Sequence, residues 1–247
     1  MAAVMLLSTQ GLSRHFGGLR AVDGVDFQIS EGEIHALIGP NGAGKTTFVS
    51  LLSGRIAPTA GRIQFLGEDI TAVPAHERVR KGIAYTFQIT SIFPRLSVSE
   101  NVALAAQNTL QRKYGWLGWK SGDLSRDVRL ALEKVGLADR ADIKAGALAY
   151  GHQRLLEIAM GLALAPKLMI LDEPTQGLSD SEIARFCDLV EAMSKETTVL
   201  LIEHNMAVVM RLAHRITVLN GGRLLATGLP EDIRANADVQ AAYLGGG

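Results

Sequence analysis

Four short apolar runs along the chain predict buried β-strands. They span residues 34–38, 83–87, 168–171 and 198–202; the first ends in a glycine loop, and the other three are followed by polar residues. Continuous apolar runs of this length are typical of parallel strands covered on both faces by helices. Because the carboxyl ends of parallel strands meet at one edge of a sheet, we expect the residues after these runs to line one ligand crevice.

Other stretches predict helices and small antiparallel elements. The first 30 residues alternate short apolar segments with turn residues, which favours a small flanking antiparallel sheet. Residues 46–52 are compatible with a helix, and the pattern over residues 98–165 is mostly helical, with amphipathic stretches at 101–110 and 124–135. An Asn-Gly turn at residue 220 predicts a late hairpin.

These elements together predict one α/β domain over residues 1–247. Its core is expected at about residues 1–90 and 166–247, with the antiparallel strands at its flank. A helical subdomain is expected as an insertion at about residues 91–165.

Composition narrows the classes of partner. Hydrophobic residues make up 47% of the chain, enough for a sizeable core. Lys plus Arg and Asp plus Glu each number 25, so there is no net charge to hold nucleic acid, and we expect no nucleic-acid partner. The single cysteine, Cys187, lies on an apolar helix face and is expected in the core.

Membrane insertion and secretion are not expected from the apolar pattern. The longest apolar stretches, near Leu162 and Leu200, are interrupted at Pro166 and Glu203, short of the roughly 18 residues that a membrane-spanning helix needs. The apolar N-terminus is short and has no positive leading segment. We therefore expect a cytoplasmic protein that contacts a membrane only through partners.

A glycine-rich loop after the first predicted strand has the pattern of a phosphate-binding loop. Two glycines bracket four residues and are followed by Lys and Thr, in the order Gly39, Pro40, Asn41, Gly42, Ala43, Gly44, Lys45 and Thr46. Backbone N–H groups and the helix N-terminus would face the phosphate oxygens. Lys45 would add a positive charge at the β/γ-phosphates, and the Thr46 hydroxyl would ligate Mg²⁺.

Two carboxylates follow the third predicted strand. Asp172 could hold Mg²⁺ through water, and Glu173 could polarise an attacking water molecule. Alone, a strand that ends in Asp-Glu is weak evidence, and the alternative is two solvated loop acids; with a phosphate loop upstream the pair points to an NTPase. Gln88 and His204 follow the second and fourth strand runs, which places an amide and an imidazole at neighbouring strand ends.

The order of these motifs resembles that of the ATP-binding cassette (ABC) family over nearly the whole chain. The distinguishing segment is Leu148-Ala-Tyr-Gly-His-Gln153, about twenty residues before the Asp-Glu pair. The resemblance implies an ABC-type P-loop NTPase fold that hydrolyses ATP with Mg²⁺. It also implies that Gln88 senses metal and γ-phosphate, His204 is the switch histidine, Phe16 stacks on adenine and Thr47 is a further phosphate contact.

The resemblance further implies a dimer that sandwiches nucleotide. Tyr150 and Gly151 belong to the signature motif, which in this family lies opposite the phosphate loop of a second subunit, where Gly151 would donate its N–H to the γ-phosphate. Three residues depart from the family pattern: Ala149 replaces Ser, His152 replaces Gln and Ser179 replaces Asp. Loss of one neutral hydrogen bond at Ala149 would cost about 1 kcal/mol, which the other phosphate contacts should outweigh. Ser179 also begins a capping box, Ser-Asp-Ser-Glu.

Finer similarity is to the cassettes of branched-chain amino acid importers. It rests on the signature segment and on Leu156-Glu-Ile-Ala159, Ile202-Glu-His-Asn-Met206 and Ala242-Tyr-Leu-Gly245. Related cassettes serve urea, amides and aromatic acids, so these cargoes stay open. The implied partners are two membrane permease subunits, a second cassette of the same or a different chain, and, indirectly, a periplasmic or extracellular solute-binding protein.

In this family residues 89–100 dock the permease, and Ile92 and Phe93 are expected to be exposed there. The protein would then lie on the cytoplasmic face of the inner membrane, attached through the permease. The alternative class is a nontransport ABC ATPase, which usually has two cassettes or coiled-coil arms, and neither appears in this sequence. The sequence argues against a phosphate-loop kinase, which would lack the signature segment and a histidine at the position of His204.

Overall fold

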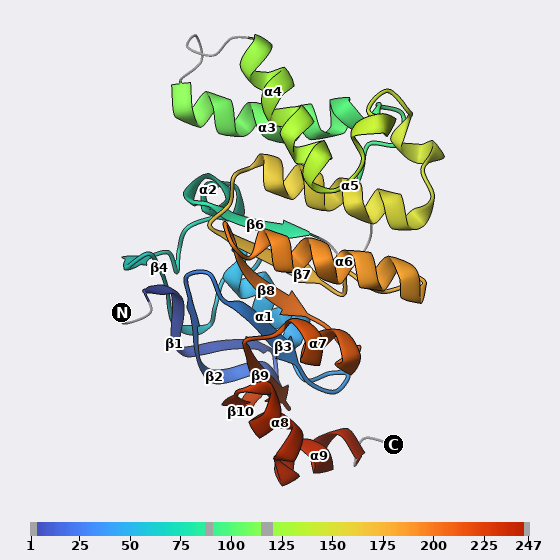
Figure 1. Ribbon diagram of the computed structural model, residues 1–247. Coiled ribbons are helices and arrows are strands. Elements are labelled where there is room, and N and C mark those ends of the chain that lie inside the picture. Colours follow the sequence, from blue (N-terminus) through green and yellow to red (C-terminus); the bar gives the residue numbers. More distant parts are fainter. Residues whose placement is uncertain (1–3, 87–90, 115–120, 245–247) are drawn as a thin grey trace.

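The computed structural model describes residues 4–86, 91–114 and 121–244. Its centre is a six-stranded sheet (Figure 1) whose strands are, in spatial order, β10 (Arg223–Gly228), β9 (Arg215–Asn220), β3 (Ile34–Ile38), β8 (Thr198–Ile202), β7 (Leu168–Asp172) and β6 (Ile83–Thr86). All neighbours are parallel except β10, which pairs antiparallel with β9 through the predicted Asn-Gly turn. The four apolar runs are therefore four adjacent parallel strands, as predicted, although Phe87 lies outside the described residues.

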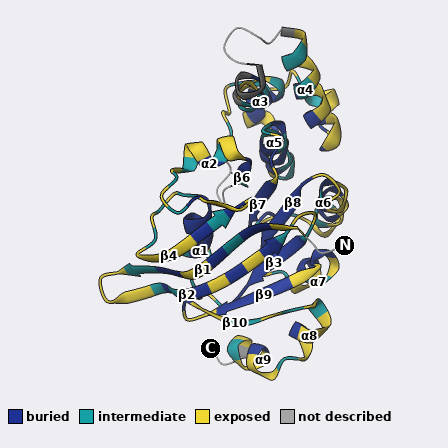
Figure 2. Ribbon diagram, turned by 90° about the vertical axis from the view of Figure 1, so that its left-hand side faces the viewer, coloured by how far each residue is buried: buried dark blue, intermediate teal, exposed yellow. Residues whose placement is uncertain are grey.

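A four-stranded antiparallel sheet flanks one face of this centre. Its order is β2 (Leu19–Ser30), β1 (Met5–Phe16), β4 (Ala60–Phe65) and β5 (Glu68–Asp69). Helix α1 (Lys45–Leu52) is buried between the two sheets, and the Phe48 ring meets the Phe27 ring edge-on at 5.4 Å. Strands β3, β7 and β8 are buried along their whole length (Figure 2) because both of their faces are covered.

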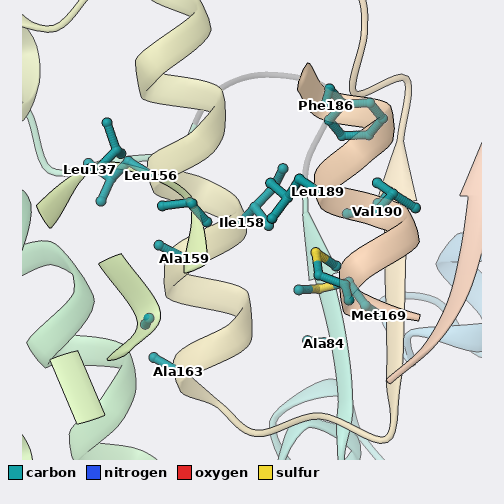
Figure 3. Close-up of a cluster of buried hydrophobic side chains, with 14 of the residues drawn as sticks. Ala84, Leu137, Leu156, Ile158, Ala159, Ala163, Met169, Phe186, Leu189 and Val190 are labelled. Carbon is teal, nitrogen blue, oxygen red and sulfur yellow. The ribbon is translucent and has the colours of Figure 1, made fainter. Parts of the chain in front are cut away.

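The opposite face of the central sheet packs on a layer of helices. Helices α5 (Tyr150–Ala163) and α6 (Asp180–Met193) lie next to the sheet, and α3 (Val98–Tyr114) and α4 (Ser121–Lys134) pack on α5, on the side away from the sheet (Figure 1). Figure 3 shows Ile158 of α5 beside Leu189 of α6, with Val190 of α6 and Met169 of β7 close by. Gly161 allows α5 to approach β7 closely, since a Cβ there would lie 2.7 Å from the Met169 methyl carbon.

The remaining helices are short. They are α2 (Ala75–Lys81), α7 (Met206–Leu212), α8 (Pro230–Ala235) and α9 (Ala237–Leu244), with 3₁₀ turns η1 (Ala138–Arg140) and η2 (Ala145–Ala147). Residues of α7, α8 and α9 form a third apolar cluster against β3 and β9. Within the part of the chain that is described, every helix is too short or too polar to cross a bilayer.

Two local predictions about α6 are confirmed. Cys187 is 1% exposed and belongs to the core formed by the helices and the central sheet. The Glu182 carboxylate accepts the Ser179 backbone N–H at 2.9 Å, which closes the predicted capping box at the start of the helix.

Candidate functional site

The strand order brings several predicted residues to one edge of the central sheet. Strands β3, β8 and β7 are parallel neighbours, so their carboxyl ends lie side by side. The phosphate loop (residues 39–46) follows β3, His204 comes two residues after β8, and Asp172 and Glu173 lie at the end of β7. Gln88, expected after β6, lies outside the described residues. The edge therefore gathers groups from three separate segments of the chain, as the strand pattern predicts.

The phosphate loop is tightly packed at its two ends. A Cβ on Gly39 would lie 2.2 Å from the Leu219 carbonyl oxygen, and one on Gly44 would lie 2.3 Å from the Ala21 carbonyl oxygen. Gly44 also has a left-handed φ of 97° directly before α1. Only glycine meets both demands without displacing the neighbouring backbone.

The start of α1 is suited to bind an anion. The first four N–H groups of a helix have no partner within the helix, and the helix dipole favours negative charge there. No side chain caps α1 and no acidic residue lies in its first turn. Asn41, Gly42 and Thr46 are exposed, whereas Pro40 and Thr47 are half-buried and Ala43 is buried.

Lys45 lies in the phosphate loop, close enough to Asp172 and Glu173 for their charges to act on its ammonium group. Its ammonium group donates hydrogen bonds to the carbonyl oxygens of Gly39 at 2.7 Å and Pro40 at 3.1 Å. Burial lowers the pKa of Lys45, and the negative charges of Glu173 and Asp172 act in the opposite direction. The cation and the two carboxylates thus share one local field, and the phosphate loop faces the end of β7.

Asp172 has a partner that sequence reasoning missed. The Tyr85 hydroxyl, on the neighbouring strand β6, donates a hydrogen bond to Asp172 Oδ2 at 2.6 Å. Burial raises the pKa of Asp172, while the Tyr85 hydrogen bond lowers it. Burial and the adjacent carboxylate also raise the pKa of Tyr85, which keeps its proton on the phenol and available to donate.

Glu173 adopts a strained backbone conformation. Its φ is 46°, in the left-handed region, which costs a non-glycine residue of order 1–3 kcal/mol. Its N–H donates to the Ile202 carbonyl at 2.9 Å, which ties the end of β7 to the end of β8. The chain turns away from the sheet directly after Asp172. The Glu173 side chain is half-buried.

Phe16 lies beside the phosphate loop at the tip of the β1–β2 hairpin. It pairs with Leu19, and Ala21, two residues further along β2, is the residue whose carbonyl oxygen meets Gly44. The Phe16 ring is 46% exposed, and the Arg14 guanidinium lies 4.6 Å from the ring centroid. The ring is thus held by a cation–π contact while much of it stays open to solvent.

Tyr150 and Gly151 belong to a different part of the surface. A Cβ on Gly151 would lie 2.2 Å from Glu182 Oε1, and one on Gly177 would lie 3.1 Å from the Tyr150 ring. The signature segment therefore packs against the loop and helix that follow β7. Ala149 is exposed directly before α5 and supplies no side-chain cap.

His152 accepts a weak hydrogen bond in the signature segment. Its Nδ1 lies 3.4 Å from Arg140 Nη1. Burial lowers the pKa of His152, and the charges of Arg140 and Arg185 lower it further. The substitution for Gln therefore places a neutral acceptor at this position at physiological pH.

The expected docking segment is anchored by a buried side chain of α3 and is only partly exposed. Asn101 is fully buried; its side chain accepts the Phe93 N–H at 2.7 Å and donates to the Phe93 carbonyl at 3.1 Å. Phe93 is 52% exposed. The expectation for Ile92 was wrong: its side chain is half-buried and packs on the helical core.

Comparison with known proteins decides the family. A family model described as "ABC transporter" matches residues 22–176. The chain belongs to the ABC transporter family. A second model, described as "Branched-chain amino acid ATP-binding cassette transporter", matches residues 223–247, the last strand and the C-terminal helices.

Full-length similarity supports membership of the ABC family. The chain is 41% identical over 249 aligned positions to the high-affinity branched-chain amino acid transport ATP-binding protein BraF of Pseudomonas aeruginosa, covering 97% of this chain and 98% of BraF. The same figures hold for LivG of Escherichia coli K12. A solved ABC transporter cassette in its ADP conformation superposes with a TM-score of 0.86 at 27% identity, covering 98% of this chain and 99% of that one. The predicted resemblance and fold class are confirmed.

Proposed function

We propose that this chain binds ATP with Mg²⁺ and hydrolyses it as the motor subunit of a membrane importer. The observation that carries the proposal is the meeting of Lys45, Asp172 and Glu173 at the uncapped start of α1. A cation, a buried carboxylate and a second carboxylate beside an anion-binding helix end are the groups that phosphoryl transfer to water requires.

The residues present fit a magnesium-bound triphosphate. The loop amides of residues 39–46, Lys45 and Thr47 would hold the phosphates, and the exposed side of the Phe16 ring would stack on adenine. The Thr46 hydroxyl would ligate Mg²⁺, with Asp172 acting through water and Gln88 as a further ligand. When bound, Mg²⁺ neutralises charge on the β- and γ-phosphates.

Glu173 would orient the attacking water, because its carboxylate follows Asp172 directly and shares the field of Lys45. His204, exposed at the end of the neighbouring strand β8, would contact the γ-phosphate side of the site. We further propose that Tyr150 and Gly151 close over the nucleotide of a second cassette. Their separate position on the surface and the uncapped start of α5 suit a contact made across a dimer.

The importer assignment rests on the relatives. BraF and LivG are named as branched-chain amino acid transport proteins, and they align over nearly the whole chain. We propose the same cargo class here, with two permease subunits docked at the exposed Phe93, an indirect solute-binding partner, and a position on the cytoplasmic face of the membrane. Urea, amides and aromatic acids are the alternative cargoes.

The ATPase proposal is tested with the purified chain. We expect Lys45→Ala to weaken ATP binding about tenfold or more, because the phosphates lose their principal side-chain cation. Glu173→Gln should bind ATP like wild type but hydrolyse it about 100-fold or more slowly. Equal turnover of wild type and Glu173→Gln would contradict the role of Glu173, and an inactive wild type would contradict the proposal.

A further inference from the structure

A buried carboxylate links two of the loops at the site. Glu203 follows β8, directly before His204, and is 1% exposed. Its Oε1 accepts the Thr175 backbone N–H at 3.0 Å and the Thr175 hydroxyl at 2.6 Å. Its Oε2 accepts the backbone N–H groups of His204 at 3.1 Å and Asn205 at 3.3 Å. One side chain therefore joins the loop after β7 to the loop after β8.

The burial of this carboxylate needs an explanation. A carboxylate is unfavourable in a buried position unless its oxygens are hydrogen-bonded, and an apolar residue would extend the buried pattern of β8 more simply. No Lys, Arg or His among residues 4–86, 91–114 and 121–244 forms a recorded ion pair with Glu203. Glu203 instead bonds three backbone N–H groups and one hydroxyl of the two loops. Its hydrogen bonds therefore fix the position of the loop backbones.

The loop that Glu203 holds contains the strained residue of the site. Glu173, two residues before Thr175, has its φ at 46°. A strained backbone persists only where surrounding contacts fix the chain on both sides. On one side the Glu173 N–H is bonded to the Ile202 carbonyl, and on the other Thr175, itself 5% exposed, is bonded to Glu203.

We propose that Glu203 is a positioning residue for ATP hydrolysis: it holds Thr175, and through it the turn at Glu173, in fixed register with the loop that carries His204. The inference rests on the proposed function of the site. The contacts of Glu203 reach neither the phosphate loop nor Phe16, so KM for ATP should change little when Glu203 is replaced. Loss of the bridge releases Glu173 from its position toward the phosphate, and misplacement by about 1 Å can cost about 100-fold in rate.

The test compares three variants of the full-length chain with wild type by steady-state ATPase kinetics. Glu203→Ala is expected to lower kcat about tenfold or more while KM for ATP changes less than about twofold. Thr175→Val removes only the hydroxyl and should lower kcat a few-fold. Thr175→Ser keeps both donors and should retain most of the wild-type rate.

A double-variant measurement separates positioning from general loosening. In single-turnover assays with labelled ATP, Glu203→Ala is expected to add little to the slow rate of Glu173→Gln, because the carboxylate that it positions is already gone. A fold-decrease as large as in the wild-type background would overturn the proposal. So would an unchanged kcat in Glu203→Ala, or a rise in KM that accounts for its whole effect.

Three further outcomes are decisive. If Glu203→Ala does not fold, equal kcat values for Thr175→Val and Thr175→Ser overturn the proposal, and the expected order supports it. A wild-type chain that does not hydrolyse ATP overturns the proposed function and this inference with it. An active wild type with unaffected variants overturns the inference alone.

Discussion

Asp172 lies between opposing influences on its ionisation. Burial raises the pKa of Asp172, with a further contribution from the neighbouring Glu173, while the Tyr85 hydroxyl, Arg55 and Lys45 lower it. The proposed metal role needs the carboxylate form. Activity should therefore fall as the pH drops through the pKa of Asp172, and any change that raises this pKa should move that fall to higher pH.

Tyr85→Phe tests this argument. The substitution removes the 2.6 Å hydrogen bond to Asp172 and keeps the aromatic ring that the Arg55 guanidinium approaches to 5.4 Å. Because the lost bond lowers the pKa of Asp172, we expect the acid limb of the kcat–pH profile to shift to higher pH at saturating ATP and Mg²⁺. An acid limb that stays in place, or moves to lower pH, would show that Tyr85 does not tune this carboxylate.

At the scale of single residues, the sequence predicts the chemistry of contiguous motifs and misses side-chain contacts that depend on strand register. The phosphate loop and the Asp172–Glu173 pair are contiguous motifs, so their spacing alone indicates their chemistry. Tyr85 reaches Asp172 only because β6 and β7 pair in a register that sets Tyr85 against Ile170. The one available signal was a tyrosine close to the polar end of a buried strand. The partner of Glu203 lies 28 residues earlier in the chain, and the spacing gives no sign of it.

Arg78 joins the end of one helix to the start of another. It is 1% exposed, and its guanidinium donates to the carbonyls of Leu51 at 2.7 Å and Leu52 at 2.8 Å, the last residues of α1. It also donates to Ile70 at 2.7 Å, before α2. Burial lowers the pKa of Arg78 to about 10, so it remains charged at neutral pH and donates to carbonyls at the C-terminal end of α1.

The start of α7 offers a clean test of local stability. The Asn205 side chain accepts the N–H groups of Ala207 at 3.1 Å and Val208 at 3.4 Å. Asn205→Ala should lower the stability of the chain by about 1 kcal/mol, because the cap is lost. For a chain of this size that corresponds to a fall in Tm of about 2–4 °C.

Asn205→Asp is the matched control, since its carboxylate also accepts both N–H groups and should keep the wild-type Tm. Calorimetry that finds the same loss in both variants would contradict the capping role.

Helix positions are predicted well and their ends less so. Residues 101–110 and 124–135 were expected to be helical, and α3 and α4 span Val98–Tyr114 and Ser121–Lys134. The apolar period locates the core-facing stretch of a helix, whereas polar first and last turns carry no such signal. Ile92 was misplaced for a related reason: a loop residue has no period that tells its buried side from its exposed side.

At the scale of the whole molecule, we propose two surfaces for partners. The signature segment begins at the uncapped start of α5, and the docking segment presents Phe93 at 52% exposure. The buried Glu157 of α5 connects them, since it accepts the Ser91 N–H and pairs with Arg154 at 3.0 Å. Burial raises the pKa of Glu157, and its two partners oppose that shift.

Phe93→Ser tests the docking surface. An exposed side chain contributes little to folding, so the stability of the isolated chain should change by less than about 0.5 kcal/mol, and its own ATPase rate should hold. Binding to the permease subunits in detergent should weaken clearly, because an exposed aromatic anchor of the interface is removed. The same change at Leu229, 47% exposed directly before α8, serves as a surface control. Unaltered permease binding by Phe93→Ser would place the interface elsewhere.

Uptake of labelled leucine by cells in which the native gene is replaced tests the central claim most directly. Wild type should restore uptake, and Lys45→Ala, which removes the cation of the phosphate loop, should not. Uptake that is equal with both genes would contradict the claim that ATP bound at this site drives branched-chain amino acid import.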